Sequence, residues 1–252
     1  MKKRSIAVIL TIALIASSCQ PADPLTAIDI LLEPDETMLT RARLDNARLL
    51  ENYPEGFALD LSHIPHITVL QCYVRTRDLG KVIAAAKRII DAQDLSGMEL
   101  KTTGYFAVPW QGTGLGGITI APTPGLLQFQ QAVLAAVLPF IVKNGTAAAF
   151  VPNEDGSSIS RTTAAYVSAF ASRQTGKNYN PHVTIGLGRE DFLRELVTAP
   201  VAPFIFEIKN AGIYQLGEFG TARKKLWTSS HDPRIAAPSP AGSAQKASEE
   251  NI

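Results

Sequence analysis

A five-residue phrase that occurs twice constrains the fold of this chain more than any other feature. It reads Pro65-His66-Ile67-Thr68-Val69 in the first half and Pro181-His182-Val183-Thr184-Ile185 in the second, in a chain with only four histidines. β-Branched residues at alternate positions favour a strand, and a proline is tolerated where a strand begins. Because side chains alternate between the faces of a strand, each phrase presents one imidazole and one hydroxyl together, opposite two apolar residues that face a core.

The repetition separates these histidines from ordinary structural ones. A single histidine on a strand is more often a hydrogen-bonded structural residue than a catalytic one. Proline makes up only about 5% of residues in proteins, so a proline before both histidines, with a threonine two positions after both, is not expected by chance. We therefore interpret His66, Thr68, His182 and Thr184 as the candidate functional residues.

The doubled His-x-Thr-x pattern resembles the two-histidine (2H) phosphoesterase superfamily, whose bacterial branch comprises RNA 2′,3′-cyclic phosphodiesterases and 2′-5′ RNA ligase-like proteins. In that family the pattern occurs once in each of two similar lobes, and both copies face one cleft. Here the resemblance covers the chain from about residue 27 to about residue 229. It implies an α+β fold of two pseudo-symmetric lobes, with antiparallel sheets flanked by helices and a cleft between the lobes.

The same resemblance implies a metal-independent reaction that opens the 2′,3′-cyclic phosphates of nucleotides or RNA ends, together with a reversible RNA ligase activity. One imidazole acts as general base on water and the other as general acid on the departing ribose oxygen, and a reference pKa near 6.5 gives access to both protonation states. The family pattern makes His182 the base and His66 the acid, with Thr68 and Thr184 donating hydrogen bonds to the phosphate. It implies a small phosphoester or an RNA end as partner, with no cofactor and no metal.

Five further residues lie close to the phrases. Three follow the first phrase on the same expected strand, and two precede the second phrase in a polar loop. A cation or a tyrosine hydroxyl among them can contact phosphate, and an aromatic ring can stack on a base. Solvated residues without a function are the alternative for each. We predict as substrate-binding residues Gln71, Tyr73, Arg75, Lys177 and Tyr179.

The remaining cysteine and histidines are less informative. Cys72 lies an even number of residues after His66, so strict alternation gives the two the same face. A small buried residue is the other interpretation of this cysteine, and no disulfide framework is implied. His63 and His231 lack the threonine two positions on, and we assign both to the surface.

Two other classes of function stay open at this point. One is a metal-dependent hydrolase with His66 and His182 as ligands. A zinc site usually takes three or four ligands, often in a tight His-x-x-x-His or Cys-x-x-Cys spacing, and neither spacing occurs here. The other is a non-catalytic lipoprotein that binds a phosphorylated or carbohydrate ligand in the same cleft. Sensitivity to a chelator tests the first alternative, and binding without turnover indicates the second.

The two ends of the chain carry signals of their own. Three basic residues precede an apolar run of eleven residues, 6–16, which is shorter than the roughly 20 of a membrane-spanning helix and predicts a secretory signal peptide over 1–18. The letters Ala-Ser-Ser-Cys at 16–19 resemble a bacterial lipoprotein signal, in which Cys19 carries the lipid. This predicts an exported protein anchored in a membrane and facing the periplasm or the cell surface, with an ordinary cleaved signal as the alternative. Residues 233–252, rich in Ala, Pro, Ser and charge, are predicted to be disordered.

Between a tether at 19–26 and that tail, residues 27–232 are predicted to form one bilobal domain. The net charge of +1 argues against a broad basic surface for long nucleic acid, and we expect a monomer. The glycines of Gly112-x-Gly114-x-x-Gly117 match a dinucleotide-binding fingerprint. A strand-like run follows them where that fingerprint needs a helix, so we interpret them as a hairpin turn. We expect Asp78 to cap a helix, and another helix to run over 126–141.

Overall fold

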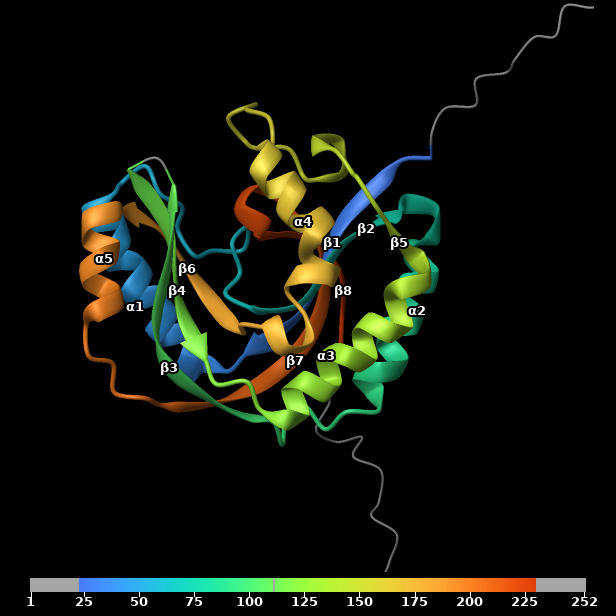
Figure 1. The fold of residues 1–252 in the computed structure, drawn as a ribbon, viewed down its shortest axis with the longest axis horizontal. Helices are drawn as coiled ribbons and strands as arrows, with labels where there is room; N and C mark the ends of the chain where they lie inside the picture. Colours follow the sequence, from blue (N-terminus) through green and yellow to red (C-terminus); the bar gives the residue numbers. More distant parts are fainter. Residues whose placement is uncertain (1–22, 111, 230–252) are drawn as a thin grey trace, which may run out of the picture.

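The computed structural model describes residues 23–110 and 112–229, and it is an α+β fold built on an antiparallel sheet with helices outside it (Figure 1). This confirms the fold class expected from the sequence. The predicted signal peptide, Cys19, His231 and the tail from 233 lie outside the described residues. The strands are β1 (Leu25–Pro34), β2 (Ile67–Arg75), β3 (Glu99–Trp110), β4 (Thr113–Ile120), β5 (Ile141–Val142), β6 (His182–Arg189), β7 (Ile205–Leu216) and β8 (Ala222–Thr228). The α-helices are α1 (Glu36–Asn52), α2 (Leu79–Asp91), α3 (Pro124–Val137), α4 (Arg161–Arg173) and α5 (Glu190–Thr198).

The strands fall into two groups that are joined into one sheet. The strand order is β1-β2-β6-β4-β3-β7-β8, with β5 paired to β2 and with β7 paired to β1 as well. The long strand β7 serves both groups, because residues 205–207 pair with β3 and residues 208–215 pair with β1. The pairings of β1, β2, β6, β4, β3 and β7 therefore close into a ring, and the two expected lobes share a strand instead of having separate sheets.

The helices cover the two groups from outside and inside. In Figure 1, α2 and α3 lie side by side next to β2, and α1 and α5 lie at the other end of the molecule beside β6, β4 and β3. The main core fills the space behind the strands, with Ile28 and Cys72 of the sheet beside Val82 and Val133 of α2 and α3. Helix α4 packs on the opposite face of β2, over a smaller cluster that includes Tyr73 and Val167.

Local sequence signals account for most of the helix ends. The carboxylate of Asp35 accepts a hydrogen bond from the amide of Met38 and caps α1, and Thr123 and Ser160 cap α3 and α4 in the same way. Asp78 occupies the N-cap position of α2, as expected, but its side chain makes no capping hydrogen bond and instead accepts from Lys81 Nζ at 2.9 Å. No helix among the described residues is long and apolar enough to cross a membrane.

Two further expectations about the middle of the chain have different outcomes. The helix expected over 126–141 ends at Val137, because the chain tightens into a 3-10 turn that contains Pro139, whose ring nitrogen cannot donate a helical hydrogen bond. The glycine-rich segment is confirmed as a hairpin between β3 and β4, with Gly112 at a φ of 83° in the turn. No helix begins there, so the dinucleotide interpretation is excluded for this segment.

Candidate functional site

The two phrases meet where the two groups of strands join. Strands β2 and β6 pair antiparallel through one residue pair, Ile67 opposite Val183. In that register His66 lies across from Thr184, and Thr68 lies across from His182. All four polar side chains therefore project from one face, related by a local pseudo-twofold axis between the central pair. Alternation within each strand gave the shared face, but this pairing of the two strands was not predicted.

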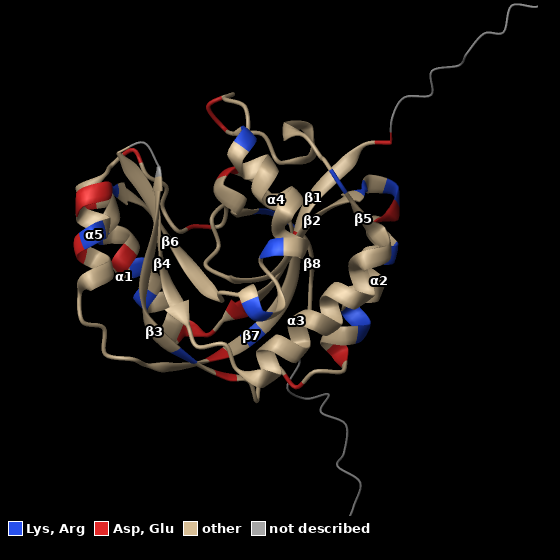
Figure 2. Ribbon diagram, in the orientation of Figure 1, with Lys and Arg blue, Asp and Glu red and all other residues tan. Residues whose placement is uncertain are grey.

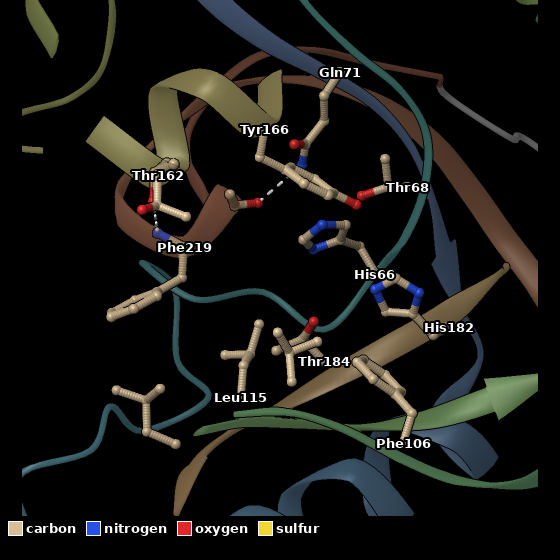
Figure 3. A pocket seen from close by; sticks show the side chains of 14 residues that line it. His66, Thr68, Gln71, Phe106, Leu115, Thr162, Tyr166, His182, Thr184 and Phe219 are labelled. Carbon is tan, nitrogen blue, oxygen red and sulfur yellow. Dashed lines mark hydrogen bonds between the residues drawn. The ribbon is translucent and has the colours of Figure 1, made fainter. Parts of the chain in front are cut away.

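The four side chains line a cavity of about 180 Å³ (Figure 3). Three other parts of the chain complete its wall: the β3–β4 hairpin, helix α4 and the short 3-10 helix Glu218–Gly220. Of the candidate residues, the structure brings five together here: His66, Thr68, Gln71, His182 and Thr184. The other lining residues are Phe106, Val108, Leu115, Thr162, Thr163, Tyr166, Leu187, Phe219 and Gly220.

Both imidazoles are oriented by the same local device. The Nδ1 atom of His66 lies 2.6 Å from the carbonyl oxygen of Ile64, and the Nδ1 atom of His182 lies 2.7 Å from that of Asn180. Each carbonyl belongs to the residue before the proline of its phrase, and a following proline keeps such a residue extended. Since a carbonyl accepts, Nδ1 carries a proton in both rings, and Nε2 is the nitrogen that the preceding backbone does not hold.

A third strand makes the two histidines different. His66 Nε2 lies 3.3 Å from Oδ2 of Asp29, a fully buried carboxylate on β1. The same Oδ2 accepts hydrogen bonds from Thr68 Oγ1 at 2.7 Å and Gln71 Nε2 at 2.9 Å. Sequence reasoning missed Asp29. A carboxylate in the middle of the otherwise apolar strand over 27–32 was the signal that pointed to it.

The two imidazoles have pKa values shifted in opposite directions. Burial opposes a charge on His66, but the hydrogen bond to Asp29 and the charge of that carboxylate outweigh it and raise the pKa of His66. Burial lowers the pKa of His182, the Asn180 carbonyl acts against this, and the charge of His66 lowers it further. Near pH 6.5 the site therefore favours a protonated His66 beside a neutral His182.

The two threonines also differ, because only one of them contacts Asp29. The Thr68 hydroxyl donates its proton to Asp29, so it is not free to donate to a ligand. The Thr184 hydroxyl lines the cavity and makes no hydrogen bond to any other described residue. Only the second copy thus offers an unengaged hydroxyl donor.

A β-bulge decides which residues of β2 reach the cavity. Ile30 of β1 pairs with Leu70 while Leu31 pairs with Thr68, so Val69 has no partner and the alternation of faces reverses after it. Gln71 consequently turns to the cavity. Cys72 turns into the main core, so the expectation that it shares a face with the histidine is wrong and its interpretation as a small buried residue is confirmed.

Two of the predicted substrate-binding tyrosines are structural. Tyr73 is buried under α4, where its hydroxyl donates to the backbone carbonyl of Ala164 at 2.9 Å. Tyr179 is buried in the main core, and its hydroxyl donates to the backbone carbonyl of Thr68 at 2.7 Å. Neither lines the cavity. Tyr179 instead ties the loop before the second phrase to the strand of the first.

The two predicted basic residues also lie outside the cavity. Arg75, at the far end of β2, pairs with Asp23 at 3.6 Å. Lys177 is exposed on the 3-10 turn that follows α4. His63, expected on the surface, is partly buried instead: it stacks on Phe57 with ring centroids 4.6 Å apart, and its Nε2 lies 3.1 Å from Arg223.

Three aromatic residues of the cavity were not anticipated as site residues. Phe106 packs edge-on against the ring of His182, with centroids 4.5 Å apart, and only a glycine at 117 leaves room for it, since a Cβ there would lie 2.1 Å from the phenyl ring. In Figure 3 the Tyr166 hydroxyl points toward Thr68. Burial and the charge of Asp29 raise the pKa of Tyr166 to about 12, so it remains a hydroxyl donor at neutral pH.

Phe219 forms the remaining aromatic wall in a strained backbone. Its φ of 60° lies in the left-handed region, which is uncommon for a bulky residue, and such positions cluster at functional sites. A hydrogen bond from its amide to Thr163 Oγ1 at 3.2 Å holds this conformation. The ring lines the cavity, and in Figure 3 it lies on the side of the cavity away from the two imidazoles.

The charge in and around the cavity is small. Among the described residues no lysine or arginine lines it, and Figure 2 shows both signs of charge scattered over the helices and strand ends. No three His, Cys, Asp or Glu side chains in the described part of the chain are grouped so as to hold a metal ion. The cavity is therefore a mainly apolar pocket with polar groups on the side of the two strands.

Comparisons with known proteins give only remote likenesses. No protein-family model matches the sequence, and neither does any curated protein. Among solved structures, TT0787 of Thermus thermophilus is 14% identical, with a TM-score of 0.47, over 81% of this chain and 96% of that one. Usb1 of Kluyveromyces marxianus is 11% identical, with a TM-score of 0.41, over 82% of this chain and 99% of that one. The case for a function therefore rests on the site itself.

Proposed function

We propose that this chain is a phosphodiesterase that opens 2′,3′-cyclic phosphates of nucleotides or RNA ends without a metal, as the 2H-like phrases imply. One observation carries the proposal: two imidazoles with equivalent hydrogen bonds and opposite pKa shifts line one cavity. A reaction that needs one general base and one general acid at the same time uses such a pair directly. A purely structural pair of histidines has no need of opposite protonation states.

The proton transfers follow from those states. Neutral His182 accepts a proton from water through Nε2 as the water oxygen bonds to phosphorus. The bond from phosphorus to one ribose oxygen breaks, and protonated His66 donates its Nε2 proton, which faces Asp29 in the free protein, to that oxygen. The product is a nucleoside 2′- or 3′-phosphate, and the pair is left with the proton on the other histidine. Exchange with water restores the starting state, and ligation is the same opening of the cyclic phosphate with an RNA 5′-hydroxyl in place of water.

Hydroxyl donors supply the remaining stabilisation. Negative charge grows on the non-bridging phosphate oxygens in the transition state, and donors fixed in a largely apolar pocket act strongly there. The Thr184 hydroxyl, which is unengaged among the described residues, is the first such donor. The Tyr166 hydroxyl is the second, because Thr68 donates to Asp29 instead. The apolar wall of Phe106, Leu115 and Phe219 suits the base of a nucleoside better than a further phosphate.

The experiment is hydrolysis of 2′,3′-cyclic mononucleotides by the chain from residue 20 onward, which contains every element of the described fold. We expect turnover that EDTA does not reduce, and a loss of about 10²- to 10⁴-fold in kcat for His66→Ala and for His182→Ala. His63→Ala, which removes a partly buried histidine outside the cavity wall, is the matched control and is expected to retain activity. Activity that survives both site substitutions would contradict the proposal.

Two other outcomes identify the alternatives. Loss of turnover with EDTA, restored by added divalent metal, would indicate a metal-dependent hydrolase. Binding of a nucleotide or sugar phosphate by a folded protein without turnover of any cyclic phosphate would indicate a non-catalytic binding protein.

We also propose that the protein is exported, as a monomer, and anchored in a membrane through Cys19. This proposal comes from the residues at 1–19 alone. Its test is fractionation of cells that express the full chain. We expect the wild type in the membrane fraction and Cys19→Ala released from it. An unlipidated wild type in the soluble exported fraction would indicate an ordinary cleaved signal.

A further inference from the structure

Asp29 is the most unusual charged group of the site. It lies in the middle of β1 and is 0% exposed. Burying a carboxylate costs free energy unless it is paired and hydrogen-bonded. Within the described part of the chain, its only ion-pair partner is His66, and no lysine or arginine contacts it. A buried carboxylate whose counter-charge is an imidazole of the site indicates that it acts on the protonation of that imidazole.

The contacts of Asp29 organise the first phrase. Its Oδ2 atom accepts hydrogen bonds from the Thr68 hydroxyl and the Gln71 amide, and it lies beside Nε2 of His66. A second bond from Gln71 Nε2 to the carbonyl of Gly220, at 3.2 Å, fixes that amide against the wall opposite. Asp29 Oδ1 and Gln71 Oε1 are both buried without a hydrogen-bond partner. The carboxylate of Asp29 and the amide oxygen of Gln71 thus form a group of acceptors beside the first phrase.

The second phrase has no equivalent. The strand next to β6 on the far side from β2 is β4, where Gly117 stands across from Thr184. On that side His182 stands across from Thr119 of β4 and packs against the phenyl ring of Phe106 from β3. No carboxylate contacts His182 or Thr184 among the described residues. The pseudo-twofold symmetry of the two phrases therefore ends at their third strands.

We propose that Asp29 is the positioning residue that makes two otherwise equivalent histidines unequal, fixing His66 as the proton donor and leaving His182 as the proton acceptor. The inference rests on the proposed function for its chemical meaning. Its physical basis is the 3.3 Å contact of one buried carboxylate with one of the two Nε2 atoms. Without that carboxylate, nothing in the two phrases would decide the direction in which the proton moves.

Other titratable groups face the same space, and none replaces Asp29. From β1, the charge of Glu33 also raises the pKa of His66, at longer range. The Glu33 carboxylate accepts its hydrogen bonds from Tyr214 and Asn210. From β6 the facing group is His182, and from α4 it is Tyr166, a neutral hydroxyl. Burial, with the charge of Asp29, also raises the pKa values of Cys72 and Tyr179, which stay neutral.

The same carboxylate bears on which phosphates the cavity accepts. Protonated His66 and ionised Asp29 cancel, and no lysine or arginine lines the described cavity. A phosphodiester carries one negative charge, whereas a phosphate monoester approaches two above its second pKa of about 6. A cavity whose charges cancel, and which offers no lysine or arginine, therefore suits the singly charged diester better than the doubly charged monoester product.

The test is an NMR titration of the histidine rings in the wild type and in Asp29→Asn, with the chain from residue 20 onward. The amide keeps an oxygen to accept from Thr68 and Gln71, removes the charge, and puts an NH2 group in place of Oδ1, the oxygen that has no hydrogen-bond partner among the described residues. We expect the His66 midpoint to fall by at least about 1 pH unit, the low end of what an opposite charge at this range contributes. Asp60→Asn, which removes a carboxylate 3.3 Å from His63, is the matched control and should leave His66 unchanged.

The readouts are chosen so that the outcomes stay separate. An unchanged His66 midpoint in Asp29→Asn overturns the inference, and so does a wild-type midpoint for His66 that lies below that of His182. The second criterion needs no variant, so it holds even if Asp29→Asn does not fold.

Turnover is not needed for the titration. If cyclic nucleotides are not hydrolysed while His66 shifts as expected, the proposed function fails and the role of Asp29 in setting the two histidines apart stands. If they are hydrolysed and His66 does not shift, the proposed function stands and the inference about Asp29 fails. In an active enzyme, the alkaline limb of kcat/KM should also move to lower pH in Asp29→Asn.

Discussion

The two copies of the phrase share their letters but not their surroundings. In both, the imidazole donates Nδ1–H to the carbonyl two residues earlier, and the threonine projects beside it. The first copy lies next to β1 and receives Asp29, whereas the second lies next to β4 and receives glycine and an apolar ring. The comparison teaches that a duplicated motif supplies the groups, while the neighbouring strand assigns their protonation states.

The same difference gives the hydroxyls of Thr68 and Thr184 different roles. In the first half, the Thr68 hydroxyl donates its hydrogen bond to Asp29 and is therefore not available to a ligand. In the second half, the threonine is unengaged and available to a ligand. Under the proposed function, a symmetric sequence therefore has one half that holds a proton and another half that accepts one and binds phosphate. The predictions below test this division, beginning with the largest expected effect.

Replacing the two threonines should have unequal effects on catalysis. Thr184→Val removes an unengaged donor from the cavity, and loss of one such donor typically costs about 10²- to 10³-fold in kcat. Thr68→Val removes a donor to Asp29 and is expected to cost less, with its effect through His66. Steady-state kinetics on a 2′,3′-cyclic mononucleotide measures both. Equal losses, or a larger loss for Thr68→Val, would show that the halves are not divided as we describe.

The pH dependence should report the two histidines separately. The lowered pKa of His182 places the acid limb of kcat/KM below pH 6.5, and the raised pKa of His66 places the alkaline limb above it. Beyond each limb the rate is expected to fall about tenfold per pH unit. The profile is measured at constant ionic strength, with substrate concentrations both below and above KM at each pH. A profile with both limbs on the same side of 6.5 would contradict the assignment.

Tyr166 should contribute a smaller effect on the first half. Tyr166→Phe removes a hydroxyl and keeps the ring that packs against Phe170. One hydrogen bond of ordinary strength is worth about 1 kcal/mol, so we expect a loss of several-fold to tenfold in kcat/KM. Tyr73→Phe, which removes a tyrosine hydroxyl outside the cavity, is the control and should leave kinetics unchanged while lowering stability. An unchanged kcat/KM in Tyr166→Phe would remove this hydroxyl from the mechanism.

The sequence predicted what depends on neighbours along the chain. The strands of the two phrases, the shared face of each imidazole and hydroxyl, and the hairpin at the glycines all follow from local patterns, and each is present. The repeated proline was informative for a reason the sequence did not reveal: it holds the carbonyl that orients each ring.

What the sequence missed depends on contacts between distant residues. The bulge at Val69 exists because β1 pairs with β2 in a shifted register, and strict alternation therefore placed Cys72 on the wrong face. Asp29 reaches the site across a strand pair, 39 positions from Thr68. Tyr73 and Tyr179 were predicted at the site on sequence distance alone, but the fold uses both as buried hydrogen-bond donors elsewhere. Local spacing cannot tell these cases apart.

The smallest expected effect is on stability, where the two histidines should act with opposite sign. His66 has its pKa raised in the folded protein, so its contribution is fully present below the unfolded value near 6.5 and is lost as the pH rises through the folded value. His182 has its pKa lowered, so the folded state loses stability as the pH falls below the unfolded value. Each unit of pKa difference corresponds to about 1.4 kcal/mol.

Substitutions can isolate each contribution. His66→Gln should remove the loss of stability on the alkaline side of pH 6.5, and His182→Gln should remove the loss on the acid side. Urea unfolding at a series of pH values measures the free energy of unfolding for each protein, and the difference from wild type is compared across the series. The same pH dependence in both variants would mean that the two copies of the phrase are electrostatically equivalent. In that case the carboxylate on β1 would not distinguish them.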